Sequence, residues 1–172
     1  MTEPQSIEDT TALHKLLRAD PQQYMRTVNN RILHDPNNTD AYFDRHLGWM
    51  RLGEPLRAID DLNRVIEAAP KPVDFLSRGD VYRHLGRYDE ALADYSRGEA
   101  MDPAAWQDDA FGLLFQADCH ARLGDQDSAL ACCARLPDDF WTPGLHGAPS
   151  GGKSDIAEKL RKAATDAPGS WT

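Results

Sequence analysis

The sequence repeats itself with a period of about 35 residues, and this periodicity restricts the chain to a small set of folds. Three stretches share a Leu-Gly pair, a short polar turn and an Ala followed by Leu or Ile. They read WMRLGEPLRAIDDL from residue 49, YRHLGRYDEALADY from 82 and HARLGDQDSALACC from 120. The interval from Gly86 to Gly124 is slightly longer than that from Gly53 to Gly86, and an alanine follows each glycine at the same distance. Such a period indicates a stack of similar units, each of which contacts its neighbours.

Residues 72–105 show how one such unit is expected to fold. Apolar and small side chains recur at helical spacing over residues 73–85, and Gly86 follows them, where a left-handed glycine commonly ends a helix. A second helix is predicted to begin near Tyr88 and to end at Pro103, because proline cannot continue the hydrogen bonds of a helix. Each unit is therefore expected to be a hairpin of two helices.

The unit resembles the tetratricopeptide repeat (TPR) family, whose motif places an aromatic, Leu-Gly, Tyr, Ala, a second aromatic and Pro in a fixed order. Residues 72–105 match this motif at Phe75, Gly79, Tyr82, Ala91, Tyr95 and Pro103. Arg78 stands where the motif has Leu. Gly79 is expected where one helix passes closest to its partner, with Ala91 opposite, because large side chains there would push the two helices apart.

The other units keep the motif with substitutions. Residues 39–71 match it at Tyr42, Trp49, Ala58, Leu62 and Pro70. Arg45 and His46 replace the Leu-Gly pair of this unit. Residues 110–137 match at Leu113, Ala117, Ala129 and Cys133. Residues 6–38 are a weaker unit, in which bulky Tyr24 replaces the motif's Ala.

The resemblance implies an all-α fold in which antiparallel helix hairpins stack into a right-handed superhelix, an α-solenoid. It implies a single TPR-like domain over residues 1–172. Its expected segments are a degenerate repeat at 6–38, repeats at 39–71 and 72–105, a degenerate repeat at 110–137, a loop at 138–153 and a capping helix at 154–166. A final helix is needed because the last repeat of a stack otherwise leaves an apolar face open. Ile156 and Leu160 are expected to face inward from this helix.

Composition and charge argue against several partners. The net charge is −9, so the phosphates of nucleic acids and anionic membrane surfaces would be repelled. No run of eighteen apolar residues is present, and the acidic N-terminal sequence lacks the apolar stretch of a signal peptide. The three cysteines are an odd number and do not suggest a disulfide framework. We therefore expect a cytoplasmic protein that binds neither nucleic acid nor membrane.

The stretch HGAPSGGKSD, residues 146–155, matches the phosphate-binding signature G-x-x-x-x-G-K-S from Gly147 to Ser154. A phosphate-binding loop needs an apolar strand before it and a helix after it, and the sequence supplies only the helix. We therefore interpret the stretch as a linker in which Ser154 or Asp155 caps the final helix. A weak anion site near Lys153 is the alternative.

Two aromatic residues and a leucine, Phe140, Trp141 and Leu145, lie in the loop before the final helix. We expect them to pin this long loop to the helical stack. The alternative is that they form an exposed docking element.

The polar residues show no catalytic or metal-binding pattern. Cys119, His120, Cys132 and Cys133 are the only cluster that resembles a metal site. The resemblance places His120 and Cys133 where the family packs aromatic side chains, and free cysteine is a common core residue. Pairs of adjacent carboxylates, such as Asp60 with Asp61, do not share a helix face. We expect a non-catalytic protein without a metal or another cofactor.

In the TPR family the first helix of each repeat lines a concave groove that holds a peptide. By position, the groove here is expected to contain Asp40, Phe43, Leu47, Met50, Leu76, Asp80, Arg83, His84, Phe111, Leu114, Asp118 and Arg122. Its apolar stripe, with Asp80 and Asp118 beside it, suggests a protein or peptide partner with apolar anchors and a basic residue. The predicted function is a protein-interaction scaffold or adaptor. The alternative is a self-associating module, a homodimer whose groove is covered.

Overall fold

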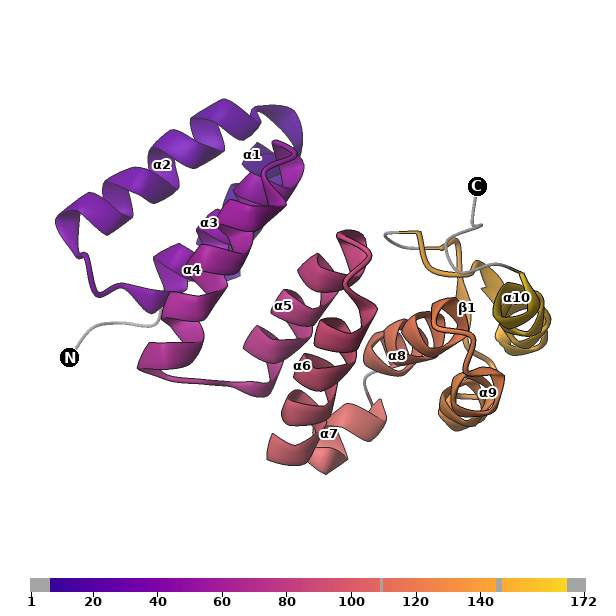
Figure 1. Ribbon diagram of the computed structural model, residues 1–172. Helices are drawn as coiled ribbons and strands as arrows, with labels where there is room; N and C mark the ends of the chain where they lie inside the picture. Colours follow the sequence, from indigo (N-terminus) through magenta and orange to yellow (C-terminus); the bar gives the residue numbers. More distant parts are fainter. Residues whose placement is uncertain (1–6, 109, 145–146, 167–172) are drawn as a thin grey trace. The chain divides into compact units, whose positions relative to one another are not determined.

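The structure, a computed structural model, describes residues 7–108, 110–144 and 147–166. Within these ranges the chain forms ten α-helices and one two-stranded ladder (Figure 1). The helices gather into two compact units, Met1–Pro70 and Lys71–Thr172. Successive helices within each unit pack as hairpins, which confirms the all-α repeat fold predicted from the sequence. The single domain expected over the whole chain stays a prediction.

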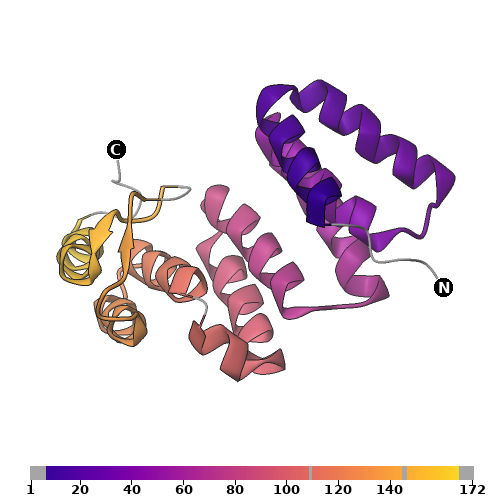
Figure 2. The same cartoon turned by 180° about the vertical axis from the view of Figure 1, so that it is seen from behind.

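The first unit contains four helices: α1 (Ile7–Ala19), α2 (Pro21–His34), α3 (Thr39–Arg51) and α4 (Pro55–Ala68). Helix α1 lies largely behind α3 and α4 in Figure 1 and is seen in front in Figure 2. Side-chain caps begin two of these helices. The Asp20 carboxylate accepts a hydrogen bond from the N–H of Gln23, and the Asn38 side chain accepts one from the N–H of Ala41. Each cap satisfies a backbone donor that has no partner inside the helix.

Tyr24 shows how the weakest repeat accommodates a bulky residue in the Ala position. Its ring is fully buried against α3, where a Cβ atom on Gly48 would come within 3.2 Å of the ring. Its hydroxyl donates to the carbonyl oxygen of Asp44 at 2.7 Å. The small residue that α2 lacks is thus supplied by Gly48 on the neighbouring helix.

The second unit contains α5 (Pro72–His84), α6 (Tyr88–Met101), α7 (Pro103–Asp108), α8 (Ala110–Arg122), α9 (Gln126–Arg135) and α10 (Lys153–Thr165). Helices α5 and α6 form one hairpin, α8 and α9 form a second, and α10 packs against both α8 and α9. The side chains of Ile156 and Leu160 on α10 are fully buried, as predicted. Helix α10 therefore covers the apolar face that the last hairpin would otherwise expose.

The glycines of the repeat have the predicted roles. A Cβ atom on Gly79 would lie 2.5 Å from the Tyr95 ring and 3.2 Å from the carbonyl oxygen of Ala91, so α5 and α6 approach closely at this point. Gly53, Gly86 and Gly124 follow α3, α5 and α8 with φ angles of 75°, 74° and 82°. These are left-handed values, which glycine adopts without the strain that a side chain would add.

The insertion that lengthens the spacing between the repeats at residues 72–105 and 110–137 forms the short helix α7. Trp106 on α7 is buried and lies over α6, where a Cβ atom on Gly98 would come within 2.8 Å of its ring. The Trp106 ring is also 6.4 Å from the Tyr95 ring between centroids. The insertion therefore adds an aromatic side chain to the core of the second unit, which the sequence did not reveal.

The segment expected to be a loop, residues 138–153, contains a short hairpin that the sequence did not predict. Strand β1 (Trp141–Thr142) pairs with β2 (Gly151–Gly152) in an antiparallel ladder. Trp141 lies opposite Gly152, and Thr142 lies opposite Gly151. The ladder therefore brings the end of this segment beside its earlier part before α10 begins at Lys153.

Candidate protein-interaction surface

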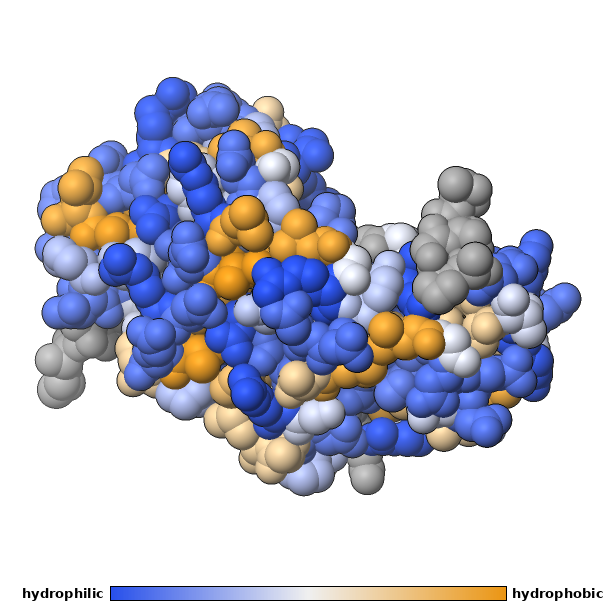
Figure 3. All heavy atoms as spheres, in the orientation of Figure 1, coloured by the Kyte–Doolittle hydropathy of each residue, from blue (hydrophilic) through white to orange (hydrophobic). Residues whose placement is uncertain are grey.

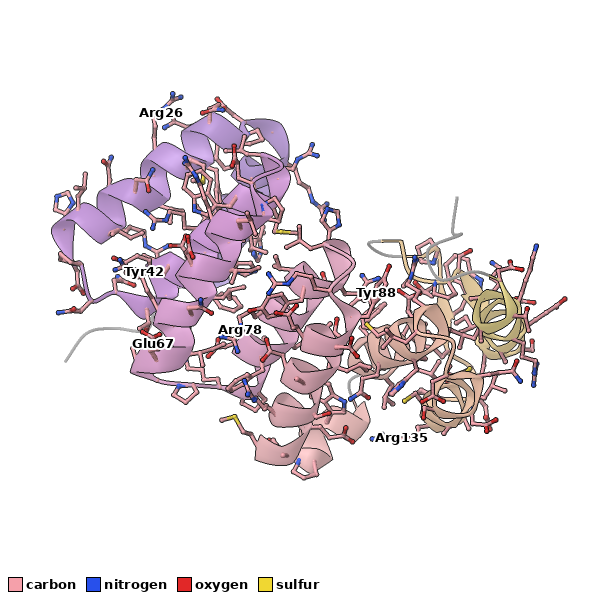
Figure 4. All side chains as sticks on the ribbon, viewed as in Figure 1. Arg26, Tyr42, Glu67, Arg78, Tyr88 and Arg135 are labelled. Atoms are coloured by element: carbon pink, nitrogen blue, oxygen red, sulfur yellow. The ribbon has the colours of Figure 1, made fainter. Side chains whose placement is uncertain are left out.

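The arginines that replace the motif's Leu make ion pairs inside their own hairpins. Arg45 on α3 binds Asp61 on α4 through two nitrogens, at 2.8 and 2.6 Å. Arg78 on α5 binds Asp94 on α6 in the same way, at 2.7 Å for both contacts (Figure 4 labels Arg78). Asp61 and Asp94 are both buried. These arginines therefore join the two helices of a hairpin and are not offered to a partner.

Aromatic side chains flank each of these arginines. The Arg45 guanidinium carbon lies 5.1 Å from the Tyr42 ring centroid and 5.9 Å from that of Trp49. Around Arg78 the matching residues at the same sequence offsets are Phe75 and Tyr82, at 5.8 and 5.9 Å. Both hairpins thus use aromatic motif residues to hold a cation by cation–π contact.

The predicted groove residues of the first unit lie on one face of α3. Phe43, Leu47 and Met50 are half-buried, and Asp40 is exposed at the start of the helix. Spacings of four and three residues place the three apolar side chains on a single helix face. Buried His46 packs against this face, with its ring 4.8 Å from that of Phe43. The face is accessible and apolar, which suits contact with another protein.

The predicted groove residues of α5 differ in exposure. His84 is exposed, Leu76 and Asp80 are partly buried, and Arg83 is buried. The sequence reasoning missed Val73, which is 47% exposed. Val73 holds the repeat position of Asp40 and of Phe111, so the same register could have found it.

A shallow apolar hollow of about 170 Å³ lies beside this face of α5. It is lined by Pro72, Val73, Leu76, Ala105 and Trp106. The last two residues come from α7, so the inserted helix builds one wall of the hollow. Figure 3 shows one face of the molecule, on which apolar residues in orange form patches separated by polar residues in blue.

Four of the predicted groove residues form a chain of ion pairs between α5 and α8. Arg83 contacts Asp80 at 2.8 Å and Asp118 at 2.8 Å, and Arg122 contacts Asp118 at 2.9 Å. Burial opposes the charge of Arg83, but attraction to Asp80 and Asp118 outweighs it and raises the pKa of Arg83 above its ordinary value. Because arginines of the chain already pair with Asp80 and Asp118, these carboxylates give no support to a basic residue on the partner.

The predicted groove residues of α8 are mostly covered. Leu114 and Asp118 are 0% exposed, Arg122 is partly buried, and Phe111 is 38% exposed. Arg83 on α5 is also buried, at 4%. We correct the sequence interpretation here: Arg83, Leu114 and Asp118 lie beneath other side chains and do not form a free surface.

The residues expected to pin the loop behave differently from one another. Phe140 is half-buried, and its ring centroid lies 5.8 Å from that of Phe111, as a pinning residue requires. The expectation is wrong for Trp141, which is 66% exposed. Leu145 lies outside the described residues.

Lys153, the lysine of the segment that matches the phosphate-binding signature, makes structural contacts. The Lys153 ammonium donates to the carbonyl oxygen of Leu136 at 2.6 Å and contacts the Asp138 carboxylate at 3.0 Å. The N–H of Gly152 bonds to the Asp155 carboxylate at 3.0 Å, which fixes the start of α10. Lys153 thus ties the start of α10 to the end of α9.

The remaining candidate sites also have structural contacts. Cys119 and Cys133 are buried, and the His120 ring lies 3.5 Å from Asp125. Among the described residues, no group of three or more His, Cys, Asp or Glu side chains is arranged to hold a metal ion. None of the helices that the structure describes is long and apolar enough to cross a membrane.

Comparisons with known families and proteins agree with this architecture. Residues 75–104 match the family described as Tetratricopeptide repeat. The chain is 31% identical over 80 residues to Tetratricopeptide repeat protein 28 of Homo sapiens, and equally so to that of Mus musculus. Each match covers 46% of this chain and 3% of the relative, so the chain spans a small part of these relatives.

Solved structures share the fold at low sequence identity. The crystal structure of MamA superposes with a TM-score of 0.65 and 17% identity, over 94% of this chain and 90% of MamA. A thermophilic TPR protein of Thermus thermophilus superposes with a TM-score of 0.63 and 18% identity, over 88% and 77% of the two chains. Both likenesses concern the fold.

Proposed function

Since the chain is a tetratricopeptide repeat protein, we propose that it is a non-catalytic scaffold that binds a segment of another protein on an apolar face of α3 or of α5, each the first helix of its repeat. The observation that carries this proposal is the apolar face of α3. Phe43, Leu47 and Met50 remain partly exposed there, although burying such side chains is favourable. Exposed apolar surface of this kind marks sites of protein contact.

The α5 face extends the argument within the second unit. Val73 is exposed beside Leu76, and the hollow they line is almost wholly apolar. A partner that places an apolar side chain there would bury surface that water now covers. The proposed partner is therefore a protein segment with apolar anchors.

The test is a pull-down from native cell extract, with proteins identified by mass spectrometry. Wild type is compared with Phe43→Glu/Met50→Glu, which places two charges on the α3 face. The matched control is Leu33→Glu/Leu56→Glu, which makes the same charge change at side chains that are 77% and 63% exposed on α2 and α4. Circular dichroism first establishes that both variants keep the helical content of wild type.

We expect a protein that wild type and the control recover and the α3 variant loses. The same proteins recovered by all three, or none recovered by any, would remove the support for the α3 face as a binding site.

Self-association is the second candidate, and the exposure of Trp141 favours it. A tryptophan that is 66% exposed on a short strand is a common anchor in protein interfaces. Light scattering over a hundredfold range of concentration measures the mass directly. A dimer in wild type that becomes a monomer in Trp141→Ser would favour this candidate, and a monomer at every concentration would argue against it.

A further inference from the structure

We name the segment between α9 and α10, residues 137–152, the strap. Its described parts are residues 137–144 and 147–152. The β1–β2 ladder joins its outgoing and returning halves near their base. Lys159 on α10 also donates to the carbonyl oxygen of Ser150 at 2.7 Å, which fixes the returning half.

Two contacts place the strap on α8. The Phe140 ring packs against Phe111 with 5.8 Å between centroids, and the Arg122 guanidinium donates to the carbonyl oxygen of Gly147 at 3.2 Å. Phe111 and Arg122 are separated by about three helical turns, so they share a face. The strap therefore touches both ends of the α8 face that contains Leu114 and Asp118.

The corresponding positions of the preceding repeat show what this face is like without a strap. Leu76 is half-buried, whereas Leu114, at the same position of the next repeat, is fully buried. The Asp80 side chain keeps 16% of its exposure, and that of Asp118 keeps none. The face is thus more exposed on α5 than on α8, where Arg83 from α5 pairs with Asp118 and the strap contacts Phe111 and Arg122.

We propose that the strap is a built-in occupant of the binding face on α8, in the repeat at residues 110–137, and must be displaced before another segment can bind there. This proposal rests on the proposed scaffold function. A competing segment would need the features that the strap presents: an aromatic side chain for Phe111 and, seven residues further on, a backbone carbonyl for Arg122. A tethered segment competes at an effective concentration on the order of millimolar, so only a segment that binds well would displace the strap.

The decisive experiment supplies the strap from outside the chain. In a trimmed variant, residues 143–150 are replaced by Asn-Gly, which closes the β1–β2 ladder with a two-residue turn, and Phe140→Ala removes the ring contact. The probe is a fluorescein-labelled synthetic peptide with the sequence of residues 137–152. Fluorescence anisotropy measures its binding after circular dichroism and thermal melting confirm that the trimmed chain is folded.

We expect saturable binding to the trimmed variant and at least tenfold weaker binding to wild type, whose own strap occupies the face. A peptide carrying Phe140→Ala should bind the trimmed variant at least fivefold more weakly. A folded trimmed variant that gives no saturable binding, or that binds no better than wild type, overturns the proposal. The outcome does not depend on any cellular partner, so it can fail while the pull-down succeeds, and the reverse.

A second measurement needs only a point substitution and keeps the strap. Leu114→Cys places a thiol on the covered face, and Cys119 on the same helix is fully buried and serves as the internal control. If the strap closes this face, lifting it exposes position 114, whereas Cys119 reacts only when α8 itself comes apart. We expect a thiol reagent to label position 114 at least tenfold faster than Cys119, measured by mass spectrometry. Equal labelling rates would show that the strap does not open independently and would overturn the proposal.

Discussion

Arg78 and Asp94 form a two-point ion pair between α5 and α6, with both nitrogen–oxygen distances at 2.7 Å. The exposed fractions of the two side chains are 12% and 3%, so the pair is largely withdrawn from water. It stands where the repeat motif has a leucine, and Arg45 with Asp61 forms the same pair one repeat earlier in the chain. In these two hairpins the motif's leucine has thus been exchanged for an ion pair between the helices, with aromatic rings beside the arginine.

Removing one partner of this pair should be far more damaging than replacing both. Arg78→Ala leaves the Asp94 carboxylate buried with a loose contact to Arg97 at 3.5 Å, so we expect a loss of about 3 kcal/mol in the free energy of unfolding. Arg78→Leu/Asp94→Leu restores an apolar pair and should recover most of that loss. Urea unfolding followed by circular dichroism measures both. If the double variant is as unstable as Arg78→Ala, the ion pair stabilises the hairpin by more than neutralising the buried charge of Asp94.

The sequence predicted those features that depend on neighbours along the chain. The left-handed glycines after α3, α5 and α8, the start of α6 at Tyr88 and the inward face of α10 all follow from local spacing. Helix propensity, capping and proline act over a few residues, and the repeat supplied three independent copies of the pattern.

The sequence reasoning missed contacts between distant residues. Phe140 and Phe111 belong to different segments of the chain, and nothing in the local pattern of either predicts that their rings are in contact. The Arg–Asp pairs did leave a signal, because an aspartate follows the arginine in the Leu position at the same distance in both repeats. Burial was also misjudged for Leu114 and Asp118, because groove positions were assumed to be open in every repeat.

The close approach at Gly79 gives a second prediction. In Gly79→Ala the new methyl group would meet the Tyr95 ring at 2.5 Å, so α5 and α6 must separate, at a cost of about 2 kcal/mol. Gly124→Ala is the control, because a Cβ there meets nothing within 4 Å and only the φ of 82° is strained, at a cost of about 1 kcal/mol. Thermal melting compares them. A smaller effect at Gly79 than at Gly124 would show that the helices can adjust without loss.

Asp125 gives a prediction for the dependence of stability on pH. Hydrogen bonds from the Ser128 hydroxyl and backbone N–H hold the pKa of Asp125 below its ordinary value. Because the pKa of Asp125 is lower in the folded state, ionised Asp125 stabilises the fold. Its contribution to the free energy of unfolding is complete above the unfolded-state pKa of about 3.9 and is lost as the pH falls through the lower folded-state pKa.

Asp125→Asn keeps a capping oxygen but cannot titrate. We expect the fall in melting temperature between pH 7 and pH 3 to be smaller in this variant than in wild type. Asp125→Ala should melt lower than either at pH 7, because the start of α9 loses its cap. An unchanged pH profile in Asp125→Asn would mean that other carboxylates carry the acid sensitivity.

Lys153 gives the last prediction, because two interpretations of the same residue lead to different results. In a nucleotide site this lysine would contact phosphates. Mg-ATP would then stabilise the folded state and raise the melting temperature once its concentration exceeds its dissociation constant. In the structure its ammonium is committed to the Leu136 carbonyl oxygen and to Asp138. Asp138 is exposed, so that ion pair is weak, and the bond to the Leu136 carbonyl is the main contribution.

We expect Lys153→Ala to lower the melting temperature by a few degrees, since a lost hydrogen bond costs about 1 kcal/mol. We also expect millimolar Mg-ATP to leave the melting temperature of wild type unchanged. Lys153→Met keeps the length of the side chain and should melt as low as Lys153→Ala if the bond to Leu136 is what matters. A saturable shift with Mg-ATP in wild type that both variants lose would instead assign this segment a phosphate-binding role.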